Sequence, residues 1–157
     1  MRFTSYAIAL GSNRRGRHGP PEAEVRAAAR ALGARTLSRV MASAAIGPSV
    51  RRFANAVALV DSDLSPPAML VLCKRIERDF GRRRGQRWGA RVIDLDLVLW
   101  SGGAWRSVGL SVPHHAFRER RFVLGPLVQV APGWRDPATA LTVRQLHARL
   151  TRPRPLA

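Results

Sequence analysis

Two acidic residues two positions apart, Asp94 and Asp96, are best placed by type and spacing to do chemistry in this chain. They lie in an alternating apolar run that predicts a β-strand over residues 92–99. Because successive side chains of a strand point to opposite faces, both carboxylates should share one face, about 7 Å apart. The alternating apolar residues should face the other way: Ile93, Leu95, Leu97 and Leu99. Two carboxylates in this arrangement can hold a hard cation such as Mg²⁺.

A segment rich in glycine and arginine precedes this strand and predicts a loop. Its arginines are Arg82, Arg83, Arg84, Arg87 and Arg91. Guanidinium groups bind phosphates through paired hydrogen bonds, and Mg²⁺ is often held by carboxylates together with substrate phosphates. The segment therefore indicates chemistry on a polyphosphate. An isolated Asp-x-Asp is also typical of a solvated strand face, but the chain has only 10 acidic residues, which favours the site.

The formal net charge of +17 predicts attraction to polyanions. Lys74 is the only lysine, and the arginines are scattered through every segment instead of following one helix face. This distribution favours a general compositional bias, so no specific nucleic-acid partner is expected.

The length of 157 residues fits one domain, over residues 1–157, that can bury a core without disulfides. The lone Cys73 lies in an apolar helical pattern and is expected to be a buried packing residue. From its pattern we expect neither a cleavable apolar leader nor an apolar run long enough to cross a bilayer. We therefore expect a cytoplasmic monomer without membrane association.

The elements that must position the acidic pair follow from periodicity and from turn residues. Strands are predicted over residues 6–10, 37–42 and 53–60, and a further short extended segment over 105–108. Helices are predicted over 21–32, 66–80 and 143–150, with a short helix or turn over 118–127. Strands interleaved with helices predict a layered α+β fold.

Several motifs, taken in order, resemble one enzyme family. They are residues 9–13 (ALGSN), 53–57 (FANAV), 91–96 (RVIDLD), 112–114 (VPH), 120–124 (RRFVL) and 126–132 (PLVQVAP). In this combination the chain resembles the 6-hydroxymethyl-7,8-dihydropterin pyrophosphokinases of folate biosynthesis. The resemblance implies a ferredoxin-like α/β sandwich with mobile loops over the active site. It also implies transfer of pyrophosphate from ATP to the pterin hydroxymethyl group, with release of AMP.

The resemblance further implies a role for each matching residue on the nucleotide side. Asp94 and Asp96 would bind two Mg²⁺ ions with ATP, and Arg82 and Arg91 would close over the phosphates as catalytic residues. The implied ATP-binding residues are Glu77, Leu97, Ser111, His114 and Arg120.

On the pterin side, the implied binding residues are Ser43, Ile46, Phe53, Asn55, Trp88 and Phe122. Asn55 would read the polar edge of the ring, Phe53 and Phe122 would stack on its faces, and Trp88 would cover it. Without the resemblance, Phe53 and Phe122 would be interpreted as core residues.

Some positions depart from the family pattern, mainly near the pterin. Met41 and Ala45 stand where a tyrosine and a proline are usual, and Gly109 stands where some members have arginine. These changes leave open a divergent pyrophosphokinase that uses another heterocyclic alcohol as acceptor. A second alternative is a basic nucleic-acid-binding domain, but the chain lacks the alternating aromatic run of such modules.

Overall fold

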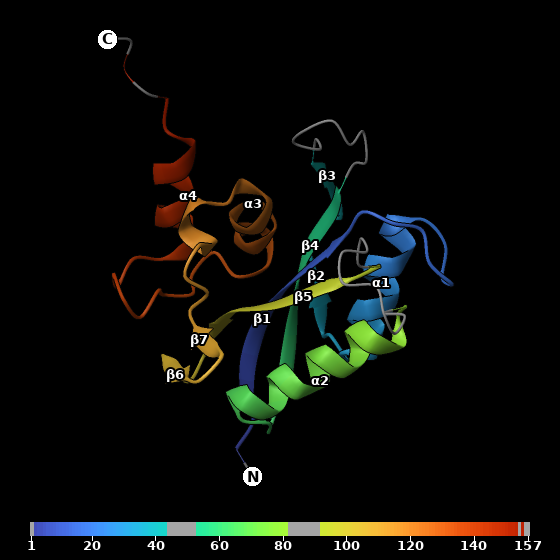
Figure 1. The fold of residues 1–157 in the computed structure, drawn as a ribbon. Helices are drawn as coiled ribbons and strands as arrows, with labels where there is room; N and C mark the ends of the chain where they lie inside the picture. Colours follow the sequence, from blue (N-terminus) through green and yellow to red (C-terminus); the bar gives the residue numbers. More distant parts are fainter. Residues whose placement is uncertain (1, 44–52, 82–91, 154, 156–157) are drawn as a thin grey trace.

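The computed structural model describes residues 2–43, 53–81, 92–153 and 155. Within these ranges the chain forms a five-stranded antiparallel sheet with the order β2-β4-β1-β5, and β3 also pairs with β4. The strands are β1 (Thr4–Ser12), β2 (Thr36–Leu37), β3 (Met41–Ser43), β4 (Phe53–Ser62) and β5 (Asp94–Trp100). The long strands β1 and β4 form the centre of the sheet (Figure 1).

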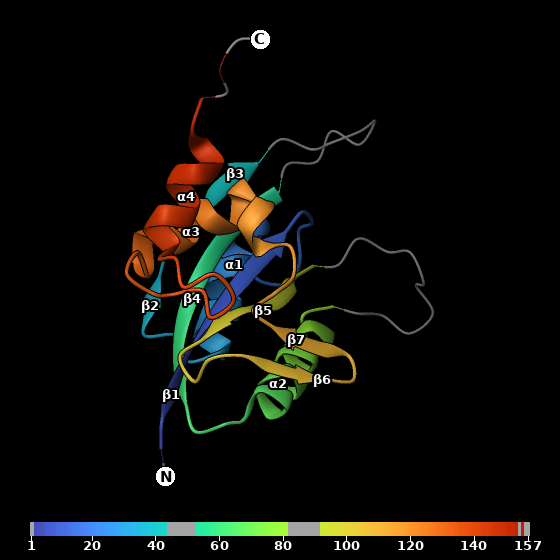
Figure 2. The same ribbon diagram turned by 90° about the vertical axis from the view of Figure 1, so that its left-hand side faces the viewer.

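Helices cover both faces of this sheet (Figure 1). One apolar cluster joins the sheet to α1 (Pro21–Ala31) and α2 (Pro66–Asp79). The other joins the opposite face to α3 (Arg121–Val130) and α4 (Val143–Thr151). A hairpin of β6 (Trp105–Ser107) and β7 (Leu110–Val112) lies beside α2 (Figure 2), and the 3₁₀-helix η1 (Phe117–Glu119) leads into α3. The expected ferredoxin-like α+β sandwich is confirmed.

Strand alternation distributes the core residues between the two clusters. In β1, Tyr6, Ile8 and Leu10 enter the first cluster, while Ala7 enters the second. Helix α2 begins as its sequence predicts, because Ser65 Oγ accepts a hydrogen bond from the Ala68 N–H. In the described ranges, no helix is both long and apolar enough to span a bilayer.

The strand predicted over residues 37–42 is divided into β2 and β3. The physical reason is Ser38, whose buried hydroxyl oxygen accepts the Val57 N–H at 2.9 Å. A side chain thereby takes a donor that a neighbouring strand carbonyl would otherwise use, and the backbone ladder is interrupted.

The predicted orientation of Leu99 is wrong. Leu95 and Leu97 lie in the first cluster as expected, but Leu99 lies in the second, together with Val98. The register between β1 and β5 shifts, because Ile8 pairs with Leu97 while Ala7 pairs with Leu99. This β-bulge places two consecutive β5 residues on the same side of the sheet.

Candidate active site

A cavity of about 500 Å³ lies between the sheet and the beginning of α3. Seven residues singled out from the sequence line it: Phe53, Asn55, Asp94, Asp96, His114, Arg120 and Phe122. They come from β4, β5, the segment after β7, and the start of α3. The structure therefore brings together residues from well-separated parts of the chain.

Strand register sets the spacing of the polar groups on the cavity floor. Gly11 of β1 pairs with Asn55 of β4 on one side and with Asp94 of β5 on the other. In the next row on the same face, Ala9 pairs with Asp96. Gly11 and Ala9 are small, so no large side chain of β1 stands between the amide of Asn55 and the two carboxylates. A flat group can lie over that floor.

The acidic pair lies on one face of β5, as alternation predicted, since both residues line the cavity. Asp94 is partly buried and Asp96 is exposed. Among the described residues, no group of three or more His, Cys, Asp or Glu side chains could enclose a metal ion. Two carboxylates on one face of a strand fit Mg²⁺, which is commonly bound through one or two protein carboxylates and completed by phosphate or water oxygens.

Opposite the sheet, the cavity is lined by the first turn of α3. Arg120 is the N-cap of this helix, and Arg121 follows it, while the first turn carries no acidic residue. Cations at a helix N-terminus oppose the helix dipole and give no stability there. The same arginines, at the N-terminus of a helix, form a favourable place for an anion.

His114 also lines the cavity. Its Nδ1 accepts a hydrogen bond from the Ala116 N–H at 3.2 Å, so the neutral ring carries its proton on Nε2. Burial lowers the pKa of His114 below its ordinary value of 6.5, and the nearby Arg120 lowers it further, against an opposing effect of Asp96. The ring is therefore a neutral hydrogen-bond donor at pH 7.

Phe122 is an aromatic residue without a core position, because 44% of its surface is exposed. Its ring lies 5.6 Å from the guanidinium carbon of Arg120, a cation–π arrangement. Phe53, which is partly buried, lines the same cavity from β4. An exposed aromatic beside a cavity is typical of a ligand-binding surface.

Three other predicted residues do not line this cavity. Glu77 of α2 is buried on the opposite face of the sheet, where its Oε2 accepts the Leu95 N–H at 2.9 Å and its Oε1 lies 3.2 Å from Lys74 Nζ. Leu97 is buried in the cluster beneath α1 and α2, and Ser111 is exposed in β7.

The remaining predicted residues have no described side chain. Ser43 is placed only by its backbone, which pairs with Phe53. Ile46, Arg82, Trp88 and Arg91 lie outside the described residues.

Sequence reasoning missed several residues that line the cavity: Ala9, Gly11, Phe117 and Arg121. A signal existed for Gly11, since a glycine inside a strand often marks a close approach of another group. The predicted strand over residues 6–10 ends before Gly11, whereas β1 continues through Ser12.

Comparison with known protein families gives one match over most of the chain. The model of the 7,8-dihydro-6-hydroxymethylpterin-pyrophosphokinase (HPPK) family matches residues 7–132. A 2-amino-4-hydroxy-6-hydroxymethyldihydropteridine pyrophosphokinase of Haemophilus influenzae is 36% identical over 136 residues, covering 82% of each chain. The Synechocystis enzyme of the same name is 38% identical over 104 residues, which are 66% of this chain but only 53% of that relative.

Solved structures show the same fold. The crystal structure of the Plasmodium falciparum HPPK-DHPS superposes with a TM-score of 0.68 and covers 94% of this chain and 41% of that one. The sequence identity is 13%, so this likeness concerns the fold alone.

Proposed function

The chain belongs to the 7,8-dihydro-6-hydroxymethylpterin-pyrophosphokinase family, and on this premise we propose that it is an ATP- and magnesium-dependent diphosphokinase. The acceptor is 6-hydroxymethyl-7,8-dihydropterin. Its hydroxymethyl oxygen attacks the β-phosphorus of ATP, and the bond from that phosphorus to the oxygen bridging the α- and β-phosphates breaks. The products are the pterin pyrophosphate ester, AMP and the proton lost by the hydroxyl group.

The observation that carries this proposal is the arrangement of the cavity floor. Asp94 and Asp96 lie on one side of Gly11, and Asn55 lies on the other. The two sides differ in chemistry, because one carries anions suited to a cation with phosphates and the other carries an amide suited to a polar ring edge. A pterin over Gly11 would direct its hydroxymethyl group toward the acidic side.

Each described residue then has a distinct task. Asp94 and Asp96 would hold Mg²⁺, which supplies charge neutralisation to the triphosphate when bound. Arg120 and Arg121 bind phosphate oxygens beside the N-terminus of α3. His114 donates a hydrogen bond from Nε2, and Phe122 offers its exposed face to the pterin ring.

Further residues keep the roles that the family resemblance implies for them. Arg82 and Arg91 act on the phosphates, Trp88 covers the ring, and Ser43 and Ile46 contribute to the pterin side. Glu77, Leu97 and Ser111 remain candidates for the ATP side. For Leu97 the contact would come from its backbone, because its side chain is buried in the core.

We further propose that residues 1–157 act as one catalytic domain in a cytoplasmic monomer that uses two Mg²⁺ ions with ATP. A mass measurement in solution tests the oligomeric state. The dependence of the reaction rate on Mg²⁺ concentration at saturating ATP tests the number of ions.

The deciding experiment is AMP release by the purified protein with ATP and Mg²⁺, with and without the hydroxymethyl pterin, and with products identified by mass. Pterin-dependent AMP formation together with a pyrophosphorylated pterin supports the proposal. AMP release that the pterin does not accelerate contradicts it.

A second acceptor is favoured by one observation at the pterin side. Met41 of β3 pairs with Asn55 and exposes 42% of its surface. Its sulfur lies 3.7 Å from Gln129 Nε2 of α3, so a flexible thioether stands next to the amide that would read the ring. Such a residue tolerates other ring shapes. A panel of hydroxymethyl heterocycles in the AMP-release assay compares this alternative with the pterin.

A further inference from the structure

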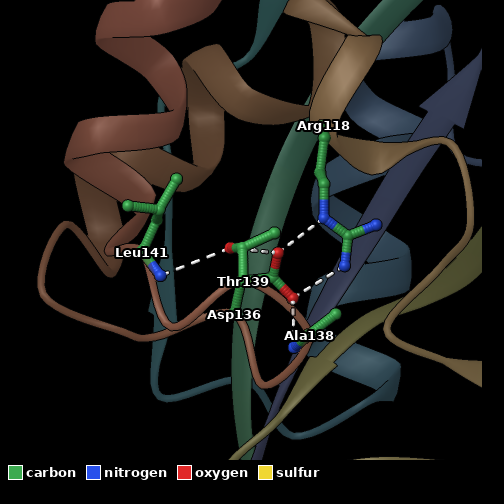
Figure 3. A network of polar contacts seen from close by, with 5 residues as sticks. All are labelled: Arg118, Asp136, Ala138, Thr139 and Leu141. Carbon is green, nitrogen blue, oxygen red and sulfur yellow. Dashed lines mark hydrogen bonds and ion pairs between the residues drawn. The ribbon is translucent and has the colours of Figure 1, made fainter.

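An ion pair between the partly exposed Arg118 and the buried Asp136 joins η1 to the loop between α3 and α4. Asp136 has no exposed surface, and its Oδ1 accepts a hydrogen bond from Arg118 Nη2 at 2.7 Å, while its Oδ2 accepts one from Arg118 Nε. The same carboxylate accepts the Ala138 N–H at 3.0 Å and the Thr139 hydroxyl at 2.8 Å (Figure 3). All the partners converge on one side chain, so the carboxylate is well satisfied despite its burial.

The arginine of this pair lies between two residues that line the cavity. Arg118 follows the buried Phe117 and precedes Arg120 by two positions. Its guanidinium carbon lies 4.6 Å from the Phe117 ring. The Arg120 N–H donates to the Phe117 carbonyl, and the Arg120 carbonyl accepts the Leu124 N–H at 2.9 Å. A contact that restrains Arg118 therefore also restrains the backbone that leads into α3.

The aspartate of the pair is itself held by its own loop. The Asp136 N–H donates to the Leu141 carbonyl and its carbonyl accepts the Ala140 N–H, both at 2.8 Å. The Leu141 N–H also reaches the Thr139 hydroxyl oxygen at 3.3 Å (Figure 3). This loop lies beyond residue 132, where the match to the family ends. The anchor therefore comes from a part of the chain that lies outside the match to the family model.

The pair is ionised at neutral pH. Burial alone would raise the pKa of Asp136, but hydrogen bonds from Arg118, Thr139 and the Ala138 N–H outweigh it and keep that pKa below 3.8. The hydrogen bond to Asp136 raises the pKa of Arg118. A charged, bidentate pair fixes direction as well as distance, because the planar guanidinium must face the carboxylate.

We propose that Arg118 and Asp136 are positioning residues, which hold η1 so that Arg120 presents its guanidinium to the phosphates of the nucleotide. This inference rests on the proposed function for the identity of that ligand. Neither residue of the pair lines the cavity, so the pair would act through neighbours that do, Phe117 and Arg120, and of these Arg120 is the one that carries a positive charge.

A double-mutant cycle tests this route. Asp136→Asn keeps the size of the side chain and removes its charge, and it should raise the KM for ATP about tenfold with kcat little changed, because a misplaced anchor weakens binding of substrate and transition state alike. In an Arg120→Ala background, the same substitution should leave the KM unchanged, since the residue through which it acts is absent. The Kd of a non-hydrolysable ATP analogue should follow the KM.

The control is Arg35→Ala, which breaks the exposed Arg35–Asp61 pair and should leave KM, kcat and Kd unchanged. If Asp136→Asn does not fold, Arg118→Lys keeps the charge but loses the paired geometry, and it enters the same cycle with an expected smaller rise.

Two results would overturn the inference: an unchanged KM and Kd in folded Asp136→Asn or Arg118→Lys protein, or an equal rise with and without Arg120. The first result accompanied by a lower melting temperature would show that the pair has a structural role only. Wild-type protein that releases no AMP would instead refute the proposed function, and the Kd cycle would still decide whether the pair positions Arg120.

Discussion

Gly11 and Asn55 face each other across the β1–β4 ladder so closely that a Cβ on Gly11 would lie 3.3 Å from the Asn55 amide oxygen. That distance is shorter than an ordinary van der Waals contact, so the amide would have to move by a few tenths of an ångström. Glycine has only a hydrogen atom at the position of the Cβ, so the wild-type protein has no such contact. The orientation of the Asn55 amide therefore depends on the absence of a side chain in the neighbouring strand.

Gly11→Ala should raise the KM for the pterin about tenfold without lowering stability, because the added methyl displaces the amide and fills the cavity floor. Replacing glycine also reduces the entropy of the unfolded chain, which offsets any small strain. Steady-state kinetics and urea unfolding measure the two effects. Gly133→Ala is the matched control, since a Cβ there would have no neighbouring atom within 4 Å. Equal KM values in both variants would contradict a role for Gly11.

Asp96→Asn should reduce turnover by a hundredfold or more, on the order of the loss when one electrostatic group of an active site is removed. Its side chain is exposed on β5, so the fold should persist. Circular dichroism and AMP release over a range of Mg²⁺ concentrations test this, and the variant should need more Mg²⁺. Asp63→Asn changes an exposed acid outside the cavity lining and should behave as wild type. An unfolded Asp96→Asn protein would make the residue structural.

Phe122→Ala should weaken pterin binding about tenfold, through the loss of an aromatic face, while changing the free energy of unfolding little. Phe117→Ala is the comparison, because Phe117 is fully buried and its truncation should cost about 3–5 kcal/mol of stability. Calorimetric titration with the pterin and urea unfolding separate the two aromatics. A large stability loss in Phe122→Ala would show that this residue belongs to the core.

The free energy of unfolding should fall as the pH is lowered below about 6.5, in part because of His114. The folded state depresses the pKa of His114 through burial, so the unfolded chain takes up this proton first as the pH drops. His114→Asn removes the titration and should flatten the slope of stability against pH from about 6.5 downward. Unfolding midpoints in urea across this range give the slope. Parallel curves for both proteins would contradict the assignment.

Residues in regular elements were largely predictable from local pattern. The two-residue period of the β5 segment correctly placed Asp94 and Asp96 on one face, because alternation is a property of any extended strand. Helix α2 was predictable from its Ser-Pro start and apolar spacing. The orientation of Leu99 was not, because a bulge depends on the register with β1 and leaves no local signal in β5.

The residues that face one another across the cavity could not be predicted from local pattern, and only tertiary contacts or family resemblance identify them. Nothing in the spacing of Asn55 and Phe122 indicates that they meet, since β4 and α3 are brought together only by the folded sheet. Asp136 is a sharper case, because an aspartate beside a proline is typical of a turn, yet its side chain is fully buried. The hydrogen bonds from Arg118, Ala138 and Thr139 compensate this burial, and the one from Arg118 depends on the tertiary fold.

Strand β5 ends the described sheet on one side, and such an edge offers backbone groups with which a second chain can pair. The carboxylate of Glu77 occupies one of them, the Leu95 N–H, midway between Asp94 and Asp96. An incoming strand would have to displace this buried acid before it could extend the sheet. The contact that supports the acidic strand thus also protects this edge against aggregation.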